Sequence, residues 1–125
     1  MRDYLISRAG LSKEMVALGK GDQQFSEILA ALEAIHKGKQ ALYGNYLETH
    51  GADPLKFCLM EHYGDIKRKF VRSENFMKKL MDGKDIPLSE LLDTYSDIAV
   101  YGALGVQLIL HLMERQNASA PETKT

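Results

Sequence analysis

From Ile98 to Met113 the chain is almost purely apolar, broken only by Gln107 and His111. This run is shorter than the roughly 20 residues that a transmembrane helix needs. We therefore predict a helix that is buried within a bundle or an oligomer, rather than a membrane span. Because the helix is apolar on nearly every face, we expect it to be central. One domain of three or four helices can hardly cover it completely, which favours a homo-oligomer.

The rest of the chain also shows helical periodicity, and no stretch alternates with the period of two that strands require. The predicted fold class is all-α: a helical bundle of three main helices plus a short N-terminal helical arm, assembled as a homo-oligomer. The first 22 residues suggest one or two short helices, divided at Gly10, with Ser12 as a possible N-cap.

The three main helices have recognisable starts. Asp22 is a plausible N-cap for the first, Asp53-Pro54 is a start signal for the second, and Pro87 opens the third, which is predicted to run to about Arg115. The predicted apolar stripe of the first helix is Phe25, Ile28, Leu29, Leu32, Ile35 and Leu42. The predicted stripe of the second is Leu55, Leu59, Tyr63, Ile66 and Phe70.

Size and charge limit the class of protein. The 125 residues suit one helical domain over residues 1–116, followed by a polar tail over residues 117–125 that we predict to be disordered. A net charge of −1 argues against direct nucleic-acid binding, which favours strongly basic domains. The single cysteine, Cys58, and the lack of a signal-peptide pattern predict a cytoplasmic location and no membrane association.

Two acidic pairs are the candidate metal ligands. Glu61 and Asp65 lie four residues apart, and so do Asp93 and Asp97, a spacing that places each pair on one helix face. Asp97 shares its face with apolar residues, so its carboxylate needs a positive partner. A divalent cation, Mg²⁺ or Mn²⁺, is one such partner because both prefer oxygen ligands.

The two pairs can meet only if they lie level in the folded chain. An unbroken second helix would place Asp65 about 25 Å from the following turn and Asp97 about 15 Å from it, at 1.5 Å per residue. We therefore predict that this helix ends or bends between Arg72 and Asn75, with Ser73 as the cap of a new short helix. An unbroken helix through Ser73 would count against a shared site.

Basic residues near the acids suit a phosphate partner. Seven of the sixteen Lys and Arg fall between Lys67 and Lys84. Among them, Arg68, Arg72 and Lys84 are the predicted phosphate contacts, because cations beside a metal ion can hold polyphosphates.

The segments "MEHYGDIKRKF" and "ELLDTYSDIAVYGAL" together resemble the MazG-like all-α nucleoside triphosphate pyrophosphohydrolases. The resemblance spans about Lys39 to Met113 and is closer to phage members, in which "YG" precedes the first acidic helix and "DTxxDxAxY" marks the second. The first acidic pair departs from the usual spacing of three. In the second pair, Glu90 with Asp93 is an alternative register to Asp93 with Asp97.

The resemblance implies a reaction, a site and assembly as a homodimer or homotetramer. The reaction converts a (d)NTP and water into (d)NMP and pyrophosphate with two or three Mg²⁺ or Mn²⁺ ions. The implied substrates are purine deoxynucleotides such as dGTP or dATP, as in the MazZ type. Glu61, Asp65, Asp93 and Asp97 would be metal ligands, with Glu61 also able to orient the water. Tyr43 and Asn45 lie in the connector before the acidic helix, where they could contact the base, although Asn45 is also a common turn residue.

Two other classes remain open. A carboxylate-bridged di-iron bundle needs two Glu-x-x-His motifs, and only Glu33 to His36 supplies one. A non-enzymatic helical interaction or oligomerisation module would explain the apolar last helix as a docking surface, but it leaves Asp97 unexplained. His36, His62 and His111 are interpreted as surface or hydrogen-bonded histidines, because no two of them have metal-ligand spacing.

Overall fold

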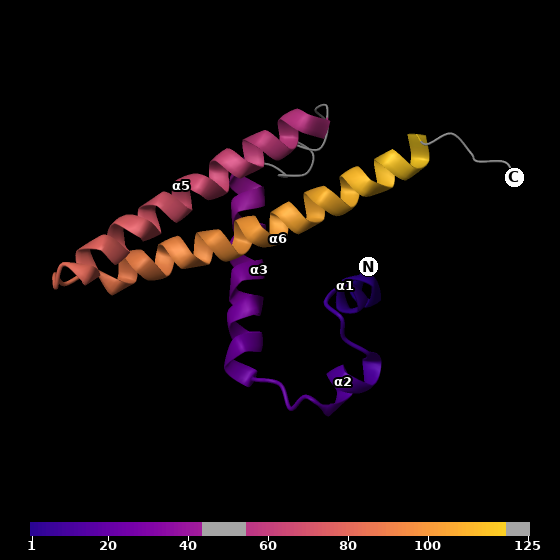
Figure 1. Ribbon diagram of the computed structural model, residues 1–125, viewed down its shortest axis with the longest axis horizontal. Helices are drawn as coiled ribbons and strands as arrows, with labels where there is room; N and C mark the ends of the chain where they lie inside the picture. Colours follow the sequence, from indigo (N-terminus) through magenta and orange to yellow (C-terminus); the bar gives the residue numbers. More distant parts are fainter. Residues whose placement is uncertain (44–54, 120–125) are drawn as a thin grey trace, which may run out of the picture. The chain divides into compact units, whose positions relative to one another are not determined.

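The computed structural model describes residues 1–43 and 55–119, all in helices and their connections (Figure 1). Within these residues the elements are α1 (Arg2–Arg8), α2 (Lys13–Leu18), α3 (Gln23–Tyr43), α5 (Leu55–Met81) and α6 (Leu88–Ser119). The described part contains no strand, so the predicted all-α class with three main helices and a short N-terminal helical arm is confirmed. The chain divides into two compact units, residues 1–30 and residues 31–125.

The predicted helix caps in the first unit are confirmed. The Ser12 hydroxyl accepts a hydrogen bond from the Met15 backbone amide at 3.1 Å, and a carboxylate oxygen of Asp22 accepts one from the Phe25 amide at 3.2 Å. These bonds satisfy backbone donors that the first turns of α2 and α3 leave without intrahelical partners. The start signal at Asp53-Pro54 lies outside the described residues.

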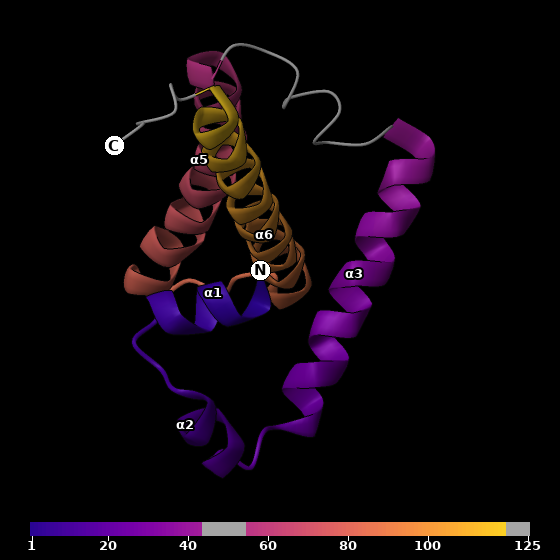
Figure 2. The same cartoon turned by 90° about the vertical axis from the view of Figure 1, so that its right-hand side faces the viewer.

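The second unit is built on an antiparallel hairpin of α5 and α6, which lie side by side in both views (Figure 2). The turn between them is set by Gly83, which has a φ of +73°. The Gly83 amide donates to the Leu80 carbonyl and the Lys84 amide donates to the Lys79 carbonyl, an arrangement that ends α5 with a glycine in the left-handed region. Pro87 then precedes α6, as predicted.

The prediction that the second helix breaks near Ser73 is wrong. Helix α5 runs without interruption through this residue, and the Ser73 hydroxyl donates a hydrogen bond to the Phe70 carbonyl at 2.7 Å. A serine that bonds back to the preceding turn is compatible with a continuing helix. Ser73 therefore does not act as a cap.

The predicted apolar stripe of α5 is not the face that packs on α6. Leu59, Tyr63 and Phe70 are 39%, 62% and 47% exposed, whereas Cys58 and Phe76 are buried. The face toward α6 also carries His62, whose ring nitrogen Nε2 lies 2.7 Å from the Tyr101 carbonyl oxygen. This ring fits because Gly105 has no side chain: a Cβ at that position would lie 2.5 Å from His62 Cε1. The interpretation of His62 as a hydrogen-bonded histidine is confirmed.

Helix α6 is only partly covered. Leu104, Leu108 and Leu112 are buried, but other large apolar side chains of the same helix are exposed. By length and composition alone, the stretch Leu88–Asn117 would be able to cross a membrane, a property that it shares with core helices of soluble proteins. The helix extends to Ser119, so residues 117–119 of the predicted disordered tail are helical. Residues 120–125 lie outside the described residues.

Candidate functional site

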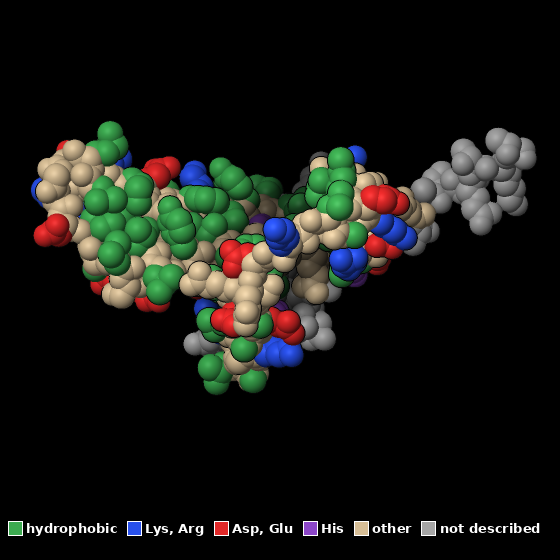
Figure 3. All heavy atoms as spheres, turned by 90° about the horizontal axis from the view of Figure 1, so that it is seen from below, with side chains coloured by type: hydrophobic (Ala, Val, Ile, Leu, Met, Phe, Trp, Pro, Cys, Tyr) green, Lys and Arg blue, Asp and Glu red, His purple; other side chains and the backbone are tan. Residues whose placement is uncertain are grey.

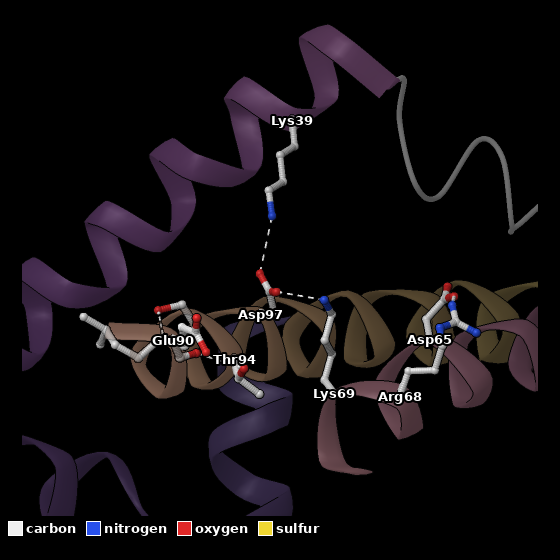
Figure 4. Close-up of polar contacts among 9 residues, drawn as sticks. Lys39, Asp65, Arg68, Lys69, Glu90, Thr94 and Asp97 are labelled. Carbon is white, nitrogen blue, oxygen red and sulfur yellow. Dashed lines mark hydrogen bonds and ion pairs between the residues drawn. The ribbon is translucent and has the colours of Figure 1, made fainter. Parts of the chain in front are cut away.

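Asp97 lies between two cations that come from other helices. Its side chain is 28% exposed, and both carboxylate oxygens face lysine ammonium groups from other helices (Figure 4). Lys39 Nζ of α3 lies 3.4 Å from Oδ1, and Lys69 Nζ of α5 lies 3.0 Å from Oδ2. The sequence predicted a positive partner for Asp97 and offered a metal ion as one such partner. In this structure two lysines supply the positive charge.

A cleft of about 250 Å³ opens beside Asp97 in the second unit. We call it the Asp97 cleft, and it is lined by Leu32, Ile35, Lys39, Asp93, Ser96, Asp97 and Val100. Both aspartates of the α6 pair therefore border one opening, together with a lysine and three apolar side chains. Four of the seven lining residues are polar or charged, which suits a polar ligand more than an apolar one.

The acids of α5 lie elsewhere along the hairpin. Asp65 pairs with Arg68 on its own helix, and its side chain is 22% exposed. Because Lys69 contacts Asp97, Asp65 is about 6 Å and Glu61 about 12 Å further from the connecting turn along α5. The contacts of His62 with Tyr101 and Gly105 fix the same register. The two acidic pairs are therefore not level, as the geometry of an unbroken helix requires.

This register decides which ligand sets can form. Within residues 1–43 and 55–119, no three His, Cys, Asp or Glu side chains come close enough to hold one metal ion. The predicted site of four acids is thus not gathered within one chain. Asp93 and Asp97 are the pair that the structure brings to one cleft.

The other predicted site residues are placed as follows. The Arg72 guanidinium lies over the Phe76 ring at 5.9 Å. Lys84 follows Gly83 in the turn between α5 and α6, and Glu90 lies in the first turn of α6. Tyr43 is the last residue of α3, and its side chain lies outside the described residues, as does Asn45.

Sequence reasoning missed three features of this site. Lys39 was not singled out, because nothing in local periodicity links it to an acid 58 residues away. Lys69 was noticed only as one charge in a basic run. Thr94 is 2% exposed, and its hydroxyl donates to the Glu90 carbonyl at 3.0 Å, so it supports the turn of α6 that carries Asp93 and Asp97. Its place between Asp93 and Asp97 in the sequence was the available signal.

Comparison with protein families, with curated proteins and with solved structures finds no match for this chain.

Proposed function

We propose that the chain is a metal-dependent nucleoside triphosphate pyrophosphohydrolase that converts a purine (d)NTP, such as dGTP or dATP, and water into (d)NMP and pyrophosphate. The observation that supports it best is the Asp97 cleft, which both Asp93 and Asp97 line. Two lysines, Lys39 and Lys69, contact Asp97 there. Carboxylates for a divalent cation and ammonium groups for phosphate oxygens are the two elements that polyphosphate binding requires.

The donor set fits one mode of metal binding. Mg²⁺ commonly binds through one or two carboxylates together with the phosphates of its substrate, and it keeps several waters. Asp93 and Asp97 suit this mode without a third protein ligand. When bound, Mg²⁺ or Mn²⁺ supplies positive charge that polarises the α-phosphate and neutralises the departing pyrophosphate. Glu61 and Asp65 remain predicted ligands, and one chain does not bring them to the cleft.

The lysines have a role both with and without nucleotide. In the free protein, Lys39 and Lys69 neutralise Asp97, which offsets the cost of holding a partly buried carboxylate. When a triphosphate enters, its oxygens can replace Asp97 as the partners of these ammonium groups, and Asp97 is then free to bind the cation. Lys39 and Lys69 therefore take the phosphate-binding role in this proposal, ahead of Arg68, Arg72 and Lys84.

The size of the cleft bears on how a nucleotide would lie. Sites for drug-sized ligands have volumes of about 300–1,000 Å³, and the Asp97 cleft has about 250 Å³. In this proposal the cleft holds the triphosphate, and the base lies outside it. Tyr43 ends α3 one turn beyond Lys39, which keeps it a candidate for base contact.

The test is an incubation of the full chain with each dNTP and NTP in the presence of Mg²⁺ or Mn²⁺. Analysis of the products by ion-exchange chromatography should show monophosphate and pyrophosphate in equal amounts, with purine deoxynucleotides preferred. Asp97→Asn should abolish turnover. Asp85→Asn, a matched change of an exposed aspartate outside the cleft, should retain it. Release of orthophosphate and diphosphate, or equal loss in both variants, would refute the proposal.

A second candidate function, a helical interaction module, is supported by the apolar side chains that the described chain leaves exposed. Among the hydrophobic residues whose side chains the structure describes, only Cys58, Phe76, Leu104, Leu108 and Leu112 are buried. Absence of turnover with every nucleotide would favour this candidate. The two candidates are compatible if assembly and catalysis use different faces of α6.

A further inference from the structure

Helix α6 has three faces, and two of them have neighbours in the structure. One face packs on α5 through residues that include Leu104, Leu108 and Leu112, and a second borders the Asp97 cleft. The third face carries six exposed large side chains: Leu88 (72%), Leu92 (66%), Tyr95 (55%), Val106 (43%), Ile109 (48%) and Met113 (39%). In the view of Figure 3, hydrophobic side chains gather over the end of the α5–α6 hairpin that carries the connecting turn.

The spacing of this third face is that of a coiled coil. With Ala99 and Gly102 at its centre, the intervals from Leu88 to Met113 alternate between four and three residues throughout. An apolar repeat of this kind winds two helices around each other, with each side chain fitting between four of the partner. We call these eight positions the α6 seam. Each heptad has two positions that flank the seam. Between Leu88 and Met113 no charged residue occupies any of them.

The order of side-chain sizes in the seam is symmetric about its centre. Three large residues precede Ala99 and Gly102, and three follow them. If a second copy of α6 runs antiparallel, Leu88 meets Met113, Leu92 meets Ile109, and Tyr95 meets Val106. Ala99 then meets Gly102 close to the two-fold axis, where small residues allow the backbones to approach. A two-fold interface requires such self-complementarity.

The charges of α6 also favour the antiparallel arrangement. Between Leu88 and Met113 the ionised residues are Glu90, Asp93 and Asp97, all in the first third of the helix, and the segment has no lysine or arginine. Parallel pairing would gather six carboxylates at the same end of the pair, on the faces away from the seam, where their repulsion is long-range and weak. Antiparallel pairing places the two acidic ends far apart and also opposes the helix dipoles.

The area is sufficient for a stable contact. Burial of six large side chains at their present exposure, at ~100 Å² each, removes ~600 Å² per copy and ~1,200 Å² in total, which reaches the range of specific interfaces. We propose that two copies of this chain associate through the α6 seam as an antiparallel, two-fold symmetric pair of helices. The proposal rests on exposed faces and spacing, and it does not depend on nucleotide hydrolysis.

The first test uses a substitution that the single chain tolerates. An added Cβ at Gly102 meets no atom within 4 Å, and glutamate is a better helix former than glycine. Gly102→Glu should therefore keep the helical content while placing an unpaired charge in the seam, which should weaken association at least ~100-fold. The matched control is Gln107→Glu, an exposed position on the same helix outside the seam.

Sedimentation equilibrium should give twice the chain mass of 14.1 kDa for the wild type and for Gln107→Glu, and the single mass for Gly102→Glu. A monomeric wild type, or a Gly102→Glu chain that stays dimeric, would overturn the proposal. Flotation with phosphatidylcholine vesicles addresses the other occupant, a lipid surface. The dimer should stay in the aqueous fraction, and recovery of the chain with the vesicles would also overturn the proposal.

The orientation is tested by cross-linking. Leu92→Cys and Ile109→Cys are prepared separately and then mixed under mild oxidation, with the native Cys58 kept because it is buried. Antiparallel pairing should give a disulfide between the two different variants. Parallel pairing would link each variant to itself instead, and that outcome would contradict the proposed interface.

Discussion

The contact between His62 and Gly105 yields a prediction whose size can be worked from the structure. In Gly105→Ala, the new methyl group would lie 2.5 Å from His62 Cε1 and 2.9 Å from Nε2, so the ring has to move. Movement breaks the 2.7 Å hydrogen bond to the Tyr101 carbonyl. Overpacking and the lost bond together cost about 2–3 kcal/mol, while the better helix propensity of alanine returns about 1 kcal/mol. The expected net loss of unfolding free energy is about 1–2 kcal/mol.

The assay is urea unfolding of four proteins: the wild type, Gly105→Ala, His62→Ala and the double variant. Without the imidazole ring, the methyl group has room, so Gly105→Ala should stabilise the His62→Ala background by about 1 kcal/mol. The coupling energy between the two positions is then about 2–3 kcal/mol. A Gly105→Ala effect that is the same in both backgrounds would refute the packing of His62 on Gly105, and with it the register that separates the two acidic pairs.

Two further substitutions have expected outcomes. Asp97→Asn should lower the unfolding free energy by up to about 1 kcal/mol, because Lys39 and Lys69 lose their anionic partner. The loss should be smaller in 0.5 M salt, where the Debye length is about 4–5 Å and the ion pairs are screened. A stabilised variant would contradict these ion pairs. Gly83→Ala should cost about 1 kcal/mol, since Gly83 has a φ of +73°. Thermal unfolding checks this prediction, with Gly38→Ala as the control. Gly38 is a helical position with free space, where alanine should raise the unfolding free energy.

The sequence was sufficient for the helices and their caps because these depend on local chemistry. Ser12 and Asp22 accept the amide hydrogen bonds that their positions predict, and Gly83 ends α5 at the turn. The break at Ser73 was predicted because a shared metal site needs the two acidic pairs to lie level, and serine is a residue type that favours caps. It failed because the same hydroxyl can bond to the preceding turn, and because the residues after it continue the helix.

The surroundings of Asp97 were harder to predict. Periodicity shows that Asp97 shares a helix face with apolar residues, but it does not identify which distant cation reaches that face. Lys39 and Lys69 come from two other helices, and their approach depends on packing that no local pattern encodes. For the same reason, the stripe predicted for α5 was wrong: the face that packs on α6 carries Cys58, His62 and Phe76, and Leu59, Tyr63 and Phe70 are exposed.

The α6 seam shows a different limit. Its spacing is present in the sequence, yet it is hidden there because apolar residues occupy almost every position from Ile98 to Met113. Only the structure separates the covered faces of α6 from the exposed one. Helix α6 thus packs on α5 with one face and borders the Asp97 cleft with a second, and the side chains of its third face are exposed.

The most direct test of the proposed function measures the binding of Mn²⁺ through the electron paramagnetic resonance signal of the free ion. Asp93 and Asp97 are the only acids among the described residues that line the cleft. Mn²⁺ should therefore bind weakly to the chain alone and tightly when a non-hydrolysable α,β-methylene analogue of dGTP is present. Asp97→Asn should remove this nucleotide-dependent binding, and Asp85→Asn should preserve it. Mn²⁺ binding that does not change with the nucleotide, or that survives in Asp97→Asn, would contradict the account.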